Sequence, residues 1–415
     1  MKNSNSRRQT PTRLSLAILS SAMLLGTFSN DANALGSDTV FISANAGVSY
    51  DDNLFRLDRG EPTPRVNASR DDLLYRFGLG LSADVPVSRQ RFRANLNITD
   101  YRYSRNSYLN YVGGSGSASW LWAVGEDWHG DLGASQSRSL QSFDYANAQQ
   151  SNVIANQTYF FNPRYRLAPN FELQGGLNYT TVTNSFDQAK FSDYKQTGLQ
   201  LGIAYIFPSA NSVGLQLQSW SVKFNTSFVV NNSTADNAYR DNRVSTFFNA
   251  QLTGKSSVDG SIGYKQRRHE NLPERDFNGW TGSVGWVYNA TGRISMRLLA
   301  SRDVGGIEDI ATTYARTYSL VIAPTYRLTS KINLSGTAQF QDLRFLGDTG
   351  SRTQGLNIGQ AGRHDKTYTL GVGGGYAATR TFRLGFNYAF TRRDSSAPLV
   401  DYDDNLIGLS GQFTF

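Results

Sequence analysis

The sequence contains no cysteine and only three histidines among its 415 residues. The absence of cysteine excludes disulfide scaffolds, thiol nucleophiles, iron–sulfur clusters and cysteine-ligated zinc. The three histidines, His129, His269 and His364, lie far apart in the sequence, which argues against a histidine-built metal or catalytic centre. The sequence also has no run of about 20 apolar residues, so a bundle of membrane-spanning helices is excluded.

Glycine and aromatic residues are abundant. The chain has 39 glycines, 13% aromatic residues and only 18% charged residues. This composition argues against disorder and favours a large, ordered, β-rich protein.

Residues 1–34 have the layout of a secretory signal peptide. A basic leader is followed by an apolar or small stretch at 14–28, and Ala32 and Ala34 occupy positions −3 and −1 of a cut after Ala34. A transmembrane anchor would need a longer span. We therefore expect two parts, a signal peptide at 1–34 and a single domain at 35–415, in a bacterial envelope protein that needs no oxidative folding.

Apolar and polar residues alternate through the mature chain in segments of about 11 to 15 residues, the period of a β-strand. Strands of soluble β-sandwiches run to about 5–6 residues, whereas a strand that crosses a bilayer needs 9–11 or more. We count 18 such segments: 40–50, 72–85, 90–104, 110–124, 128–139, 154–167, 170–183, 193–207, 211–225, 240–253, 256–269, 278–289, 293–304, 315–328, 331–343, 364–377, 381–392 and 404–415.

The connections between these segments alternate strictly between short and long. Short breaks of at most four residues fall at 86–89, 125–127, 168–169, 208–210, 254–255, 290–292, 329–330 and 378–380, and the others have 5 to 21 residues. Short turns at one end, longer loops at the other and an even strand number are typical of bacterial outer-membrane barrels. The sequence predicts an all-β fold, a single transmembrane antiparallel β-barrel of about 18 strands in outer-membrane lipid, with both termini in the periplasm.

The last segment ends in alternating apolar residues that include Phe413 and the terminal Phe415. A terminal strand of this kind resembles the signal by which the barrel-insertion machinery recognises its clients. We further expect interfacial girdles from aromatic residues near strand ends: Tyr101, Tyr103, Trp120, Trp122, Trp128, Tyr165, Tyr205, Trp280 and Trp286.

The residues that alternate with the lipid-facing positions include a basic set predicted to line the lumen: Arg76, Arg91, Arg93, Arg164, Arg166, Lys265, Arg267, Arg297 and Arg383. The acidic residues Asp84, Asp131, Glu172 and Asp259 share their face. An excess of fixed positive charge in a pore favours anions. The alternative is that the basic residues are paired with these carboxylates or lie at the rims.

Nothing in the sequence combines a histidine with an evident nucleophile on neighbouring predicted strands, so we expect no enzyme. We also expect no cofactor and no nucleic-acid partner.

One five-residue sequence word occurs twice. Residues 50–54 leave the first strand and residues 402–406 enter the last, and both read Tyr-Asp-Asp-Asn-Leu. Because first and last strands are neighbours in a closed barrel, Asp51, Asp52, Asp403 and Asp404 are expected at the outer rim of this seam. Carboxylate oxygens suit calcium, which makes a metal site one interpretation. The other is that Asp and Asn simply form turns.

The octapeptide at 50–57, which continues this word with Phe55-Arg56-Leu57, follows a signal peptide and one short strand. In this it resembles the opening of EpsL-type outer-membrane β-barrels, which are encoded in bacterial exopolysaccharide biosynthesis clusters. The resemblance implies a role in secreting a polysaccharide chain, together with periplasmic and inner-membrane export components.

Three functions are therefore open. The resemblance favours a passive aqueous conduit with a basic lumen for an exopolysaccharide. The second is a general diffusion porin for small, preferentially anionic solutes, in which loop 51–71 or 344–363 is long enough to fold inward. The third is a surface adhesin whose long loops bind a partner.

Overall fold

The computed structural model describes residues 39–415 except for 64, 66, 145–149, 227, 231–232, 236, 306–313 and 347–361. The predicted signal peptide, with its cleavage residues Ala32 and Ala34, lies outside the described residues. Among the described helices, none has the length and apolar character needed to cross a membrane.

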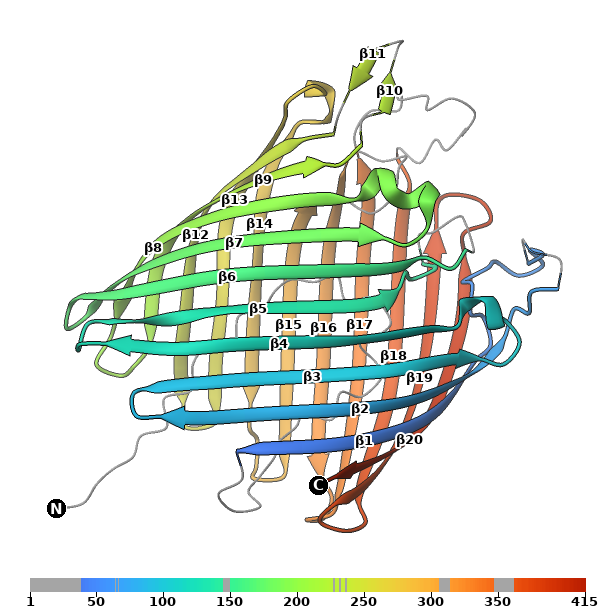
Figure 1. The fold of residues 1–415 in the computed structure, drawn as a ribbon, viewed down its shortest axis with the longest axis horizontal. Helices are drawn as coiled ribbons and strands as arrows, with labels where there is room; N and C mark the ends of the chain where they lie inside the picture. Colours follow the sequence, from blue (N-terminus) through green and yellow to red (C-terminus); the bar gives the residue numbers. More distant parts are fainter. Residues whose placement is uncertain are drawn as a thin grey trace.

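The structure consists almost entirely of antiparallel strands (Figure 1). In chain order they are β1 (Val40–Asp51), β2 (Asp72–Val87), β3 (Gln90–Tyr103), β4 (Tyr111–Val124), β5 (Trp128–Leu140), β6 (Val153–Ala168), β7 (Phe171–Asn184), β8 (Tyr194–Ile206), β9 (Ser212–Phe224), β10 (Phe228–Val230), β11 (Ser233–Ala235), β12 (Tyr239–Thr253), β13 (Ser256–His269), β14 (Phe277–Tyr288), β15 (Ile294–Gly305), β16 (Tyr314–Arg327), β17 (Ile332–Leu346), β18 (His364–Ala377), β19 (Phe382–Ser395) and β20 (Tyr402–Thr414). Three short 3₁₀ helices lie in loops: η2 (Ser107–Leu109), η3 (Asp187–Ser192) and η4 (Pro273–Arg275).

Eighteen strands form one closed sheet, in which each pairs with its neighbours in sequence and β1 pairs with β20. The exceptions are β10 and β11, which form a separate two-stranded hairpin, so that β9 pairs with β12. In Figure 1 the strands of the near wall (β3–β9) cross those of the far wall (β14–β19) at a steep angle, as expected when barrel strands tilt. Closure leaves no unpaired edge, which a spanning barrel requires because lipid offers no hydrogen bonds.

The sequence prediction of an 18-stranded antiparallel barrel is confirmed. Each predicted segment coincides with one barrel strand, and no strand end differs by more than three residues. The largest differences are at the ends of β17 and β19, where the ladders with β16 and β20 continue past the predicted ends. The hairpin β10–β11 and the 3₁₀ helices were not expected, because they lie in loops without a long alternating pattern.

The connections divide the barrel into two ends. At the short-turn end, which also carries the C-terminus, no connection exceeds five residues. At the long-loop end the connections have 6 to 20 residues. Phe413 lies at the short-turn end, where its ring stacks on Phe382 with centroids 4.4 Å apart, and Phe415 is 74% exposed.

Candidate functional site: the lumen and its outer mouth

The two faces of the barrel wall differ in chemistry. In β2, Tyr75, Phe77 and Leu79 are exposed large apolar side chains that alternate with Arg76 and Gly78. A soluble protein would bury such side chains, whereas a membrane barrel turns them to lipid. Because cross-strand partners share a face, the register carries this assignment from strand to strand around the barrel and identifies the lumen face.

At mid-height the lumen face is mostly neutral and polar. Its hydroxyl and amide side chains include Asn45, Asn95, Asn97, Ser115, Ser117, Ser135, Ser137, Thr158, Asn178, Thr180, Gln200, Gln216, Gln218, Ser261, Ser283, Ser319, Gln339, Asn387 and Ser410. Four serines of this wall, Ser115, Ser117, Ser135 and Ser137, are exposed, so this wall contacts water. Apolar side chains also occur here, and the rings of Phe160 and Phe247 lie close over Gly133 and Gly214.

A hollow of about 380 Å³ lies along this wall, lined by residues that include Asn95, Ser117, Ser135, Asn156 and Thr158. Hydroxyl and amide groups exchange hydrogen bonds with a passing solute without holding it by charge. The wall is therefore suited to neutral polar groups in water.

The register places all nine predicted basic residues on the lumen face, in two groups. Arg76, Lys265 and Arg267 lie towards the long-loop end. The other six lie towards the short-turn end: Arg91, Arg93, Arg164, Arg166, Arg297 and Arg383.

Several of the basic residues are ion-paired. Asp241 binds Arg267 at 2.7 Å and Lys265 at 3.3 Å, and Asp84 binds Arg91 at 2.5 Å and Arg93 at 3.5 Å. Pairing thus accounts for part of the basic set, as the alternative interpretation expected. Within the described part of the chain, Arg166, Arg297 and Arg383 form no ion pair, so positive charge remains at the short-turn end.

Loops close part of the mouth at the long-loop end. Phe55 from the β1–β2 loop and Phe143 from the β5–β6 loop meet edge to face, with ring centroids 5.0 Å apart. Both pack against Leu109 of η2 and against Tyr103 on the lumen face of β3. We call this packed group the outer plug. Phe55 comes from loop 51–71, one of the two loops that the sequence allowed to fold inward. Most of the other candidate loop, 344–363, lies outside the described residues.

A buried charge cluster fastens the outer plug to the barrel seam. Arg56 is 9% exposed, and its Nη1 lies 3.0 Å from an Asp51 oxygen and 2.8 Å from an Asp404 oxygen. Its Nε lies 3.6 Å from Asp144 of the β5–β6 loop. Arg56 has a left-handed backbone, with φ of 56°, a conformation that non-glycine residues seldom adopt. We call Arg56, Asp51, Asp144 and Asp404 the Arg56 cluster.

Hydrogen bonds to Asp144 hold the β5–β6 loop against β19 and β20, across the mouth. The Tyr402 hydroxyl donates to Asp144 at 3.0 Å, and Arg393 of β19 donates to the Asp144 carbonyl oxygen. Burial raises the pKa of the Asp144 carboxyl, but Arg56, Ser142 and Arg393 more than offset this and hold the pKa below its usual value. Asp144 is therefore a buried carboxylate whose charge is stabilised by its partners.

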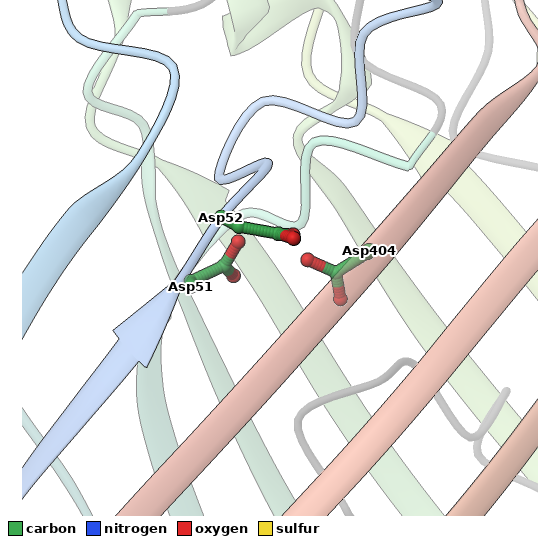
Figure 2. A group of neighbouring side chains, drawn as sticks. All are labelled: Asp51, Asp52 and Asp404. Carbon is green, nitrogen blue, oxygen red and sulfur yellow. The ribbon is translucent and has the colours of Figure 1, made fainter.

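The two Tyr-Asp-Asp-Asn words meet at the seam, as closure of the barrel required. Asp51, Asp52 and Asp404 turn toward one another, with carboxylate oxygens within 4.8 Å (Figure 2). Asp52 accepts hydrogen bonds from the backbone N–H and the side-chain amide of Asn405, at 2.7 and 2.8 Å. Three of the four acids predicted as a calcium site thus lie together, and Arg56 supplies positive charge between two of them.

Asp403 does not join this group. It alternates with Asp404, so it lies on the opposite face of β20, where it pairs with the exposed Arg59 at 2.7 Å.

Two predictions about aromatic residues are wrong. Tyr101 and Tyr103 were expected in an outer girdle, but the register places both on the lumen face, opposite Arg76 and Leu74. Arg102, between them, takes the outward position and pairs with Asp100 at 2.8 Å. In contrast, Trp128 and Tyr165 alternate with lumen residues, and their rings pack with centroids 4.8 Å apart near the short-turn end.

The three histidines lie on separate strands, β5, β13 and β18. Each lies near a carboxylate: His129 near Glu172, His269 near Asp276 and His364 near Asp342. The histidines do not meet one another.

The sequence gives no signal for the two contacts that hold the plug. These are the contact of Phe55 with Phe143 and that of Arg56 with Asp144. Arg56 stands in the octapeptide, but nothing in the sequence indicates that Asp144 folds back to it from four strands away.

A protein-family model described as "Putative beta-barrel porin 2" matches residues 242–415, from β12 to the C-terminus, which is less than half of the chain. No curated protein sequence matches the chain. Among solved structures, the barrel is similar to the Pseudomonas aeruginosa outer membrane protein OpdK, with 14% identity, a TM-score of 0.49 and coverage of 91% of this chain and 99% of that one.

Two further structures from Pseudomonas aeruginosa are similar. OccK9 (OpdG) has 13% identity and a TM-score of 0.47 over 91% of this chain and 98% of its own. OprD has 11% identity and a TM-score of 0.46 over 91% and 95%.

Proposed function

We propose that the protein is a bacterial outer-membrane channel through which small polar solutes diffuse passively, with a preference for anions. The observation that carries this proposal is the water-exposed, neutral lumen wall at mid-height, which lies between ends that carry basic residues. In this proposal the short-turn end, where β1 begins and β20 ends, faces the periplasm, and the long-loop end faces outward.

The neutral wall supports diffusion because its contacts with a solute are weak and evenly spread. Conduction requires contacts favourable enough for entry and weak enough for exit. Exposed serines of β4 and β5 around a hollow of about 380 Å³ meet this condition for small solutes.

The outer plug supports small solutes over a polymer. Phe55, Leu109 and Phe143 pack onto the lumen face, and the Arg56 cluster holds the β5–β6 loop across to β19 and β20. A bulky chain would have to displace this packed group at the mouth, and we propose that small solutes pass beside it. The family model matched by residues 242–415 also describes a porin.

The anion preference rests on charge at the short-turn end. Arg166, Arg297 and Arg383 face the lumen without an ion pair among the described residues. Fixed positive charge at a pore entrance raises the local concentration of anions.

Swelling of liposomes that contain the purified protein tests this function. Solutes of increasing size are compared at equal concentration, and each neutral solute is paired with an anionic one of similar size. We expect fast entry of monosaccharide-sized solutes, faster entry of their anionic counterparts, and slow entry of long oligosaccharides. Equal exclusion of all solutes would refute a diffusion channel.

Export of an exopolysaccharide is the second candidate function, and the octapeptide at 50–57 favours it. That segment builds the seam and the Arg56 cluster, so it has a structural role whatever passes through the lumen. The partners would then be a polysaccharide chain and periplasmic and inner-membrane export components. In a deletion strain this function predicts loss of surface polymer with accumulation in the periplasm. The diffusion channel predicts normal surface polymer and slowed solute uptake.

A further inference from the structure

Arg76 is an unusual member of the lumen-facing basic set. It is half-buried, and its Nε atom is fully buried without a hydrogen-bond partner. Within the described residues it forms no ion pair, and the phenols of Tyr101, Tyr103 and Tyr111 lie on the same face beside it. A partly desolvated guanidinium without a carboxylate is costly, and an anion from outside the chain would compensate it.

The aromatic neighbours form a defined surface beside Arg76. Tyr101 pairs with Arg76 across β2 and β3 and with Tyr111 across β3 and β4. The Tyr101 and Tyr111 rings are stacked, with centroids 4.5 Å apart and planes 3° from parallel. Neither ring belongs to the lipid-facing girdle, so their position needs another explanation than membrane anchoring.

Two glycines make room for this group. A Cβ atom at Gly47 would lie 3.3 Å from Arg76 Nη2, and one at Gly113 would lie 2.6 Å from the Tyr111 ring. The guanidinium and the rings therefore lie close against the wall. The outer plug packs on the long-loop side of the group, through Tyr103, Tyr111 and Leu109.

On the short-turn side, the wall continues into the neutral hollow. Thr99 and Gly113 pair at the next lumen position, and Asn97 pairs with Ser115 at the one after. Ser115 lines the hollow of about 380 Å³. A solute that passes the plug thus meets a cation and an aromatic surface first, and hydroxyl and amide groups next.

We propose that Arg76, Tyr101 and Tyr111 form a binding subsite for small acidic sugars, solutes that combine one carboxylate with a hydroxylated ring. The guanidinium pairs with the carboxylate through charge-assisted hydrogen bonds. The tyrosines supply an aromatic surface and hydroxyl groups for the ring. This inference rests on the proposed diffusion channel and names the class of solute that the channel takes.

The test is block of single-channel current by glucuronate, with glucose and acetate as partial ligands. Glucuronate combines both chemical features, whereas glucose lacks the carboxylate and acetate lacks the ring. We expect glucuronate to block at a concentration about tenfold lower than either partial ligand, since each lacks one set of contacts.

Variants assign the block to the subsite. Arg76→Gln is expected to weaken glucuronate block about tenfold without changing glucose block. Tyr101→Leu is expected to weaken block by glucuronate and glucose alike. Arg102→Gln is the matched control. It removes the same charge from β3, at the residue next to Tyr101, but on the outward face of the barrel. It is expected to leave block unchanged.

The outcomes separate the two proposals. A purified barrel that conducts no ions refutes the diffusion channel itself. A barrel that conducts but is blocked equally by glucuronate, glucose and acetate refutes the subsite alone. So does equal weakening of glucuronate block in Arg76→Gln and Arg102→Gln. Arg76→Lys guards against misfolding of the glutamine variant, since it keeps the charge and is expected to keep part of the block.

Discussion

Arg56 at the long-loop end and two arginines at the short-turn end, Arg297 and Arg383, have opposite environments. At the long-loop end, Arg56 is buried among Asp51, Asp144 and Asp404, where its charge holds loops together. At the short-turn end, Arg297 and Arg383 face the lumen with no ion pair in the described chain. The charge of Arg56 stabilises contacts between loops, whereas the charges of Arg297 and Arg383 remain available to solutes in the lumen.

The difference follows from loop length. Turns of at most five residues at the short-turn end are too short to fold back into the lumen over its arginines. The β1–β2 and β5–β6 loops are long enough to return acidic and aromatic side chains to the wall. We therefore expect the unpaired arginines of the short-turn end to contribute to anion preference, whereas Arg56 at the long-loop end holds the outer plug.

Replacing Arg56 is expected to have the largest effect. Arg56→Met removes the cation that Asp51 and Asp404 share and one of the two cations beside Asp144. Breaking a buried ion pair in this way costs about 3–5 kcal/mol. The plug should loosen while the barrel stays closed. Limited proteolysis of the β1–β2 loop and single-channel current noise would both increase.

Arg59→Met is the control for this variant, because the Arg59 side chain is 87% exposed in its pair with Asp403. An exposed pair contributes about 0–1 kcal/mol. If both variants loosen the plug equally, the Arg56 cluster does not hold it.

The short-turn end is probed by Arg297→Ser combined with Arg383→Ser. In a water-filled lumen each charge contributes about 1 kcal/mol to an ion about 4 Å away. The reversal potential in a salt gradient should shift toward cation permeation, with plug stability unchanged. The matched control is Arg91→Ser with Asp84→Ser, which removes both members of an ion pair. An equal shift in this control would show that unpaired arginines do not set the selectivity.

Acid is expected to act on the plug through Asp144. The folded pKa of Asp144 lies below its unfolded value, because Arg56, Ser142 and Arg393 outweigh burial. Its stabilising contribution is therefore complete above the unfolded pKa of about 3.9 and is lost as the pH falls through the lower folded pKa. Channel noise should be flat from neutral pH to about pH 5 and should rise below about pH 4. An unchanged acid response in Asp144→Asn would contradict this assignment.

Calcium is expected to have the smallest effect. In the wild type Arg56 supplies the positive charge between Asp51 and Asp404, so added calcium should not change the protease resistance of the plug. In Arg56→Met the group Asp51, Asp52 and Asp404 is left for a cation. Calcium at a few times its Kd should then restore about 1 kcal/mol of stability. Calcium-dependent protection of the wild type would instead support the metal site predicted from the repeated words.

The fold could be predicted because its signals are local and periodic. Alternation along strands such as β19 indicates which residues face lipid and which face the lumen. The alternation of short and long connections indicates the two ends of the barrel. The lumen face followed from the same alternation. The meeting of Asp51 and Asp404 could also be predicted, because closure makes β1 and β20 neighbours.

The plug could not be predicted, because its contacts join loops that carry no periodic pattern. Asp144 and Arg393 are 249 residues apart, and no spacing indicates their meeting. Tyr101 and Tyr103 were misplaced for a related reason. An aromatic residue near a strand end suits a lipid girdle by composition, but its neighbour Arg102 takes the outward position and leaves the tyrosines in the lumen.

The most direct test of a water-filled, anion-preferring lumen is the reversal potential of the purified wild-type protein in a planar bilayer under a potassium chloride gradient. A water-filled lumen that prefers anions should give a steady conductance and a reversal potential of the sign given by chloride permeation. The absence of conductance, or a reversal potential of the sign given by potassium permeation, would contradict it.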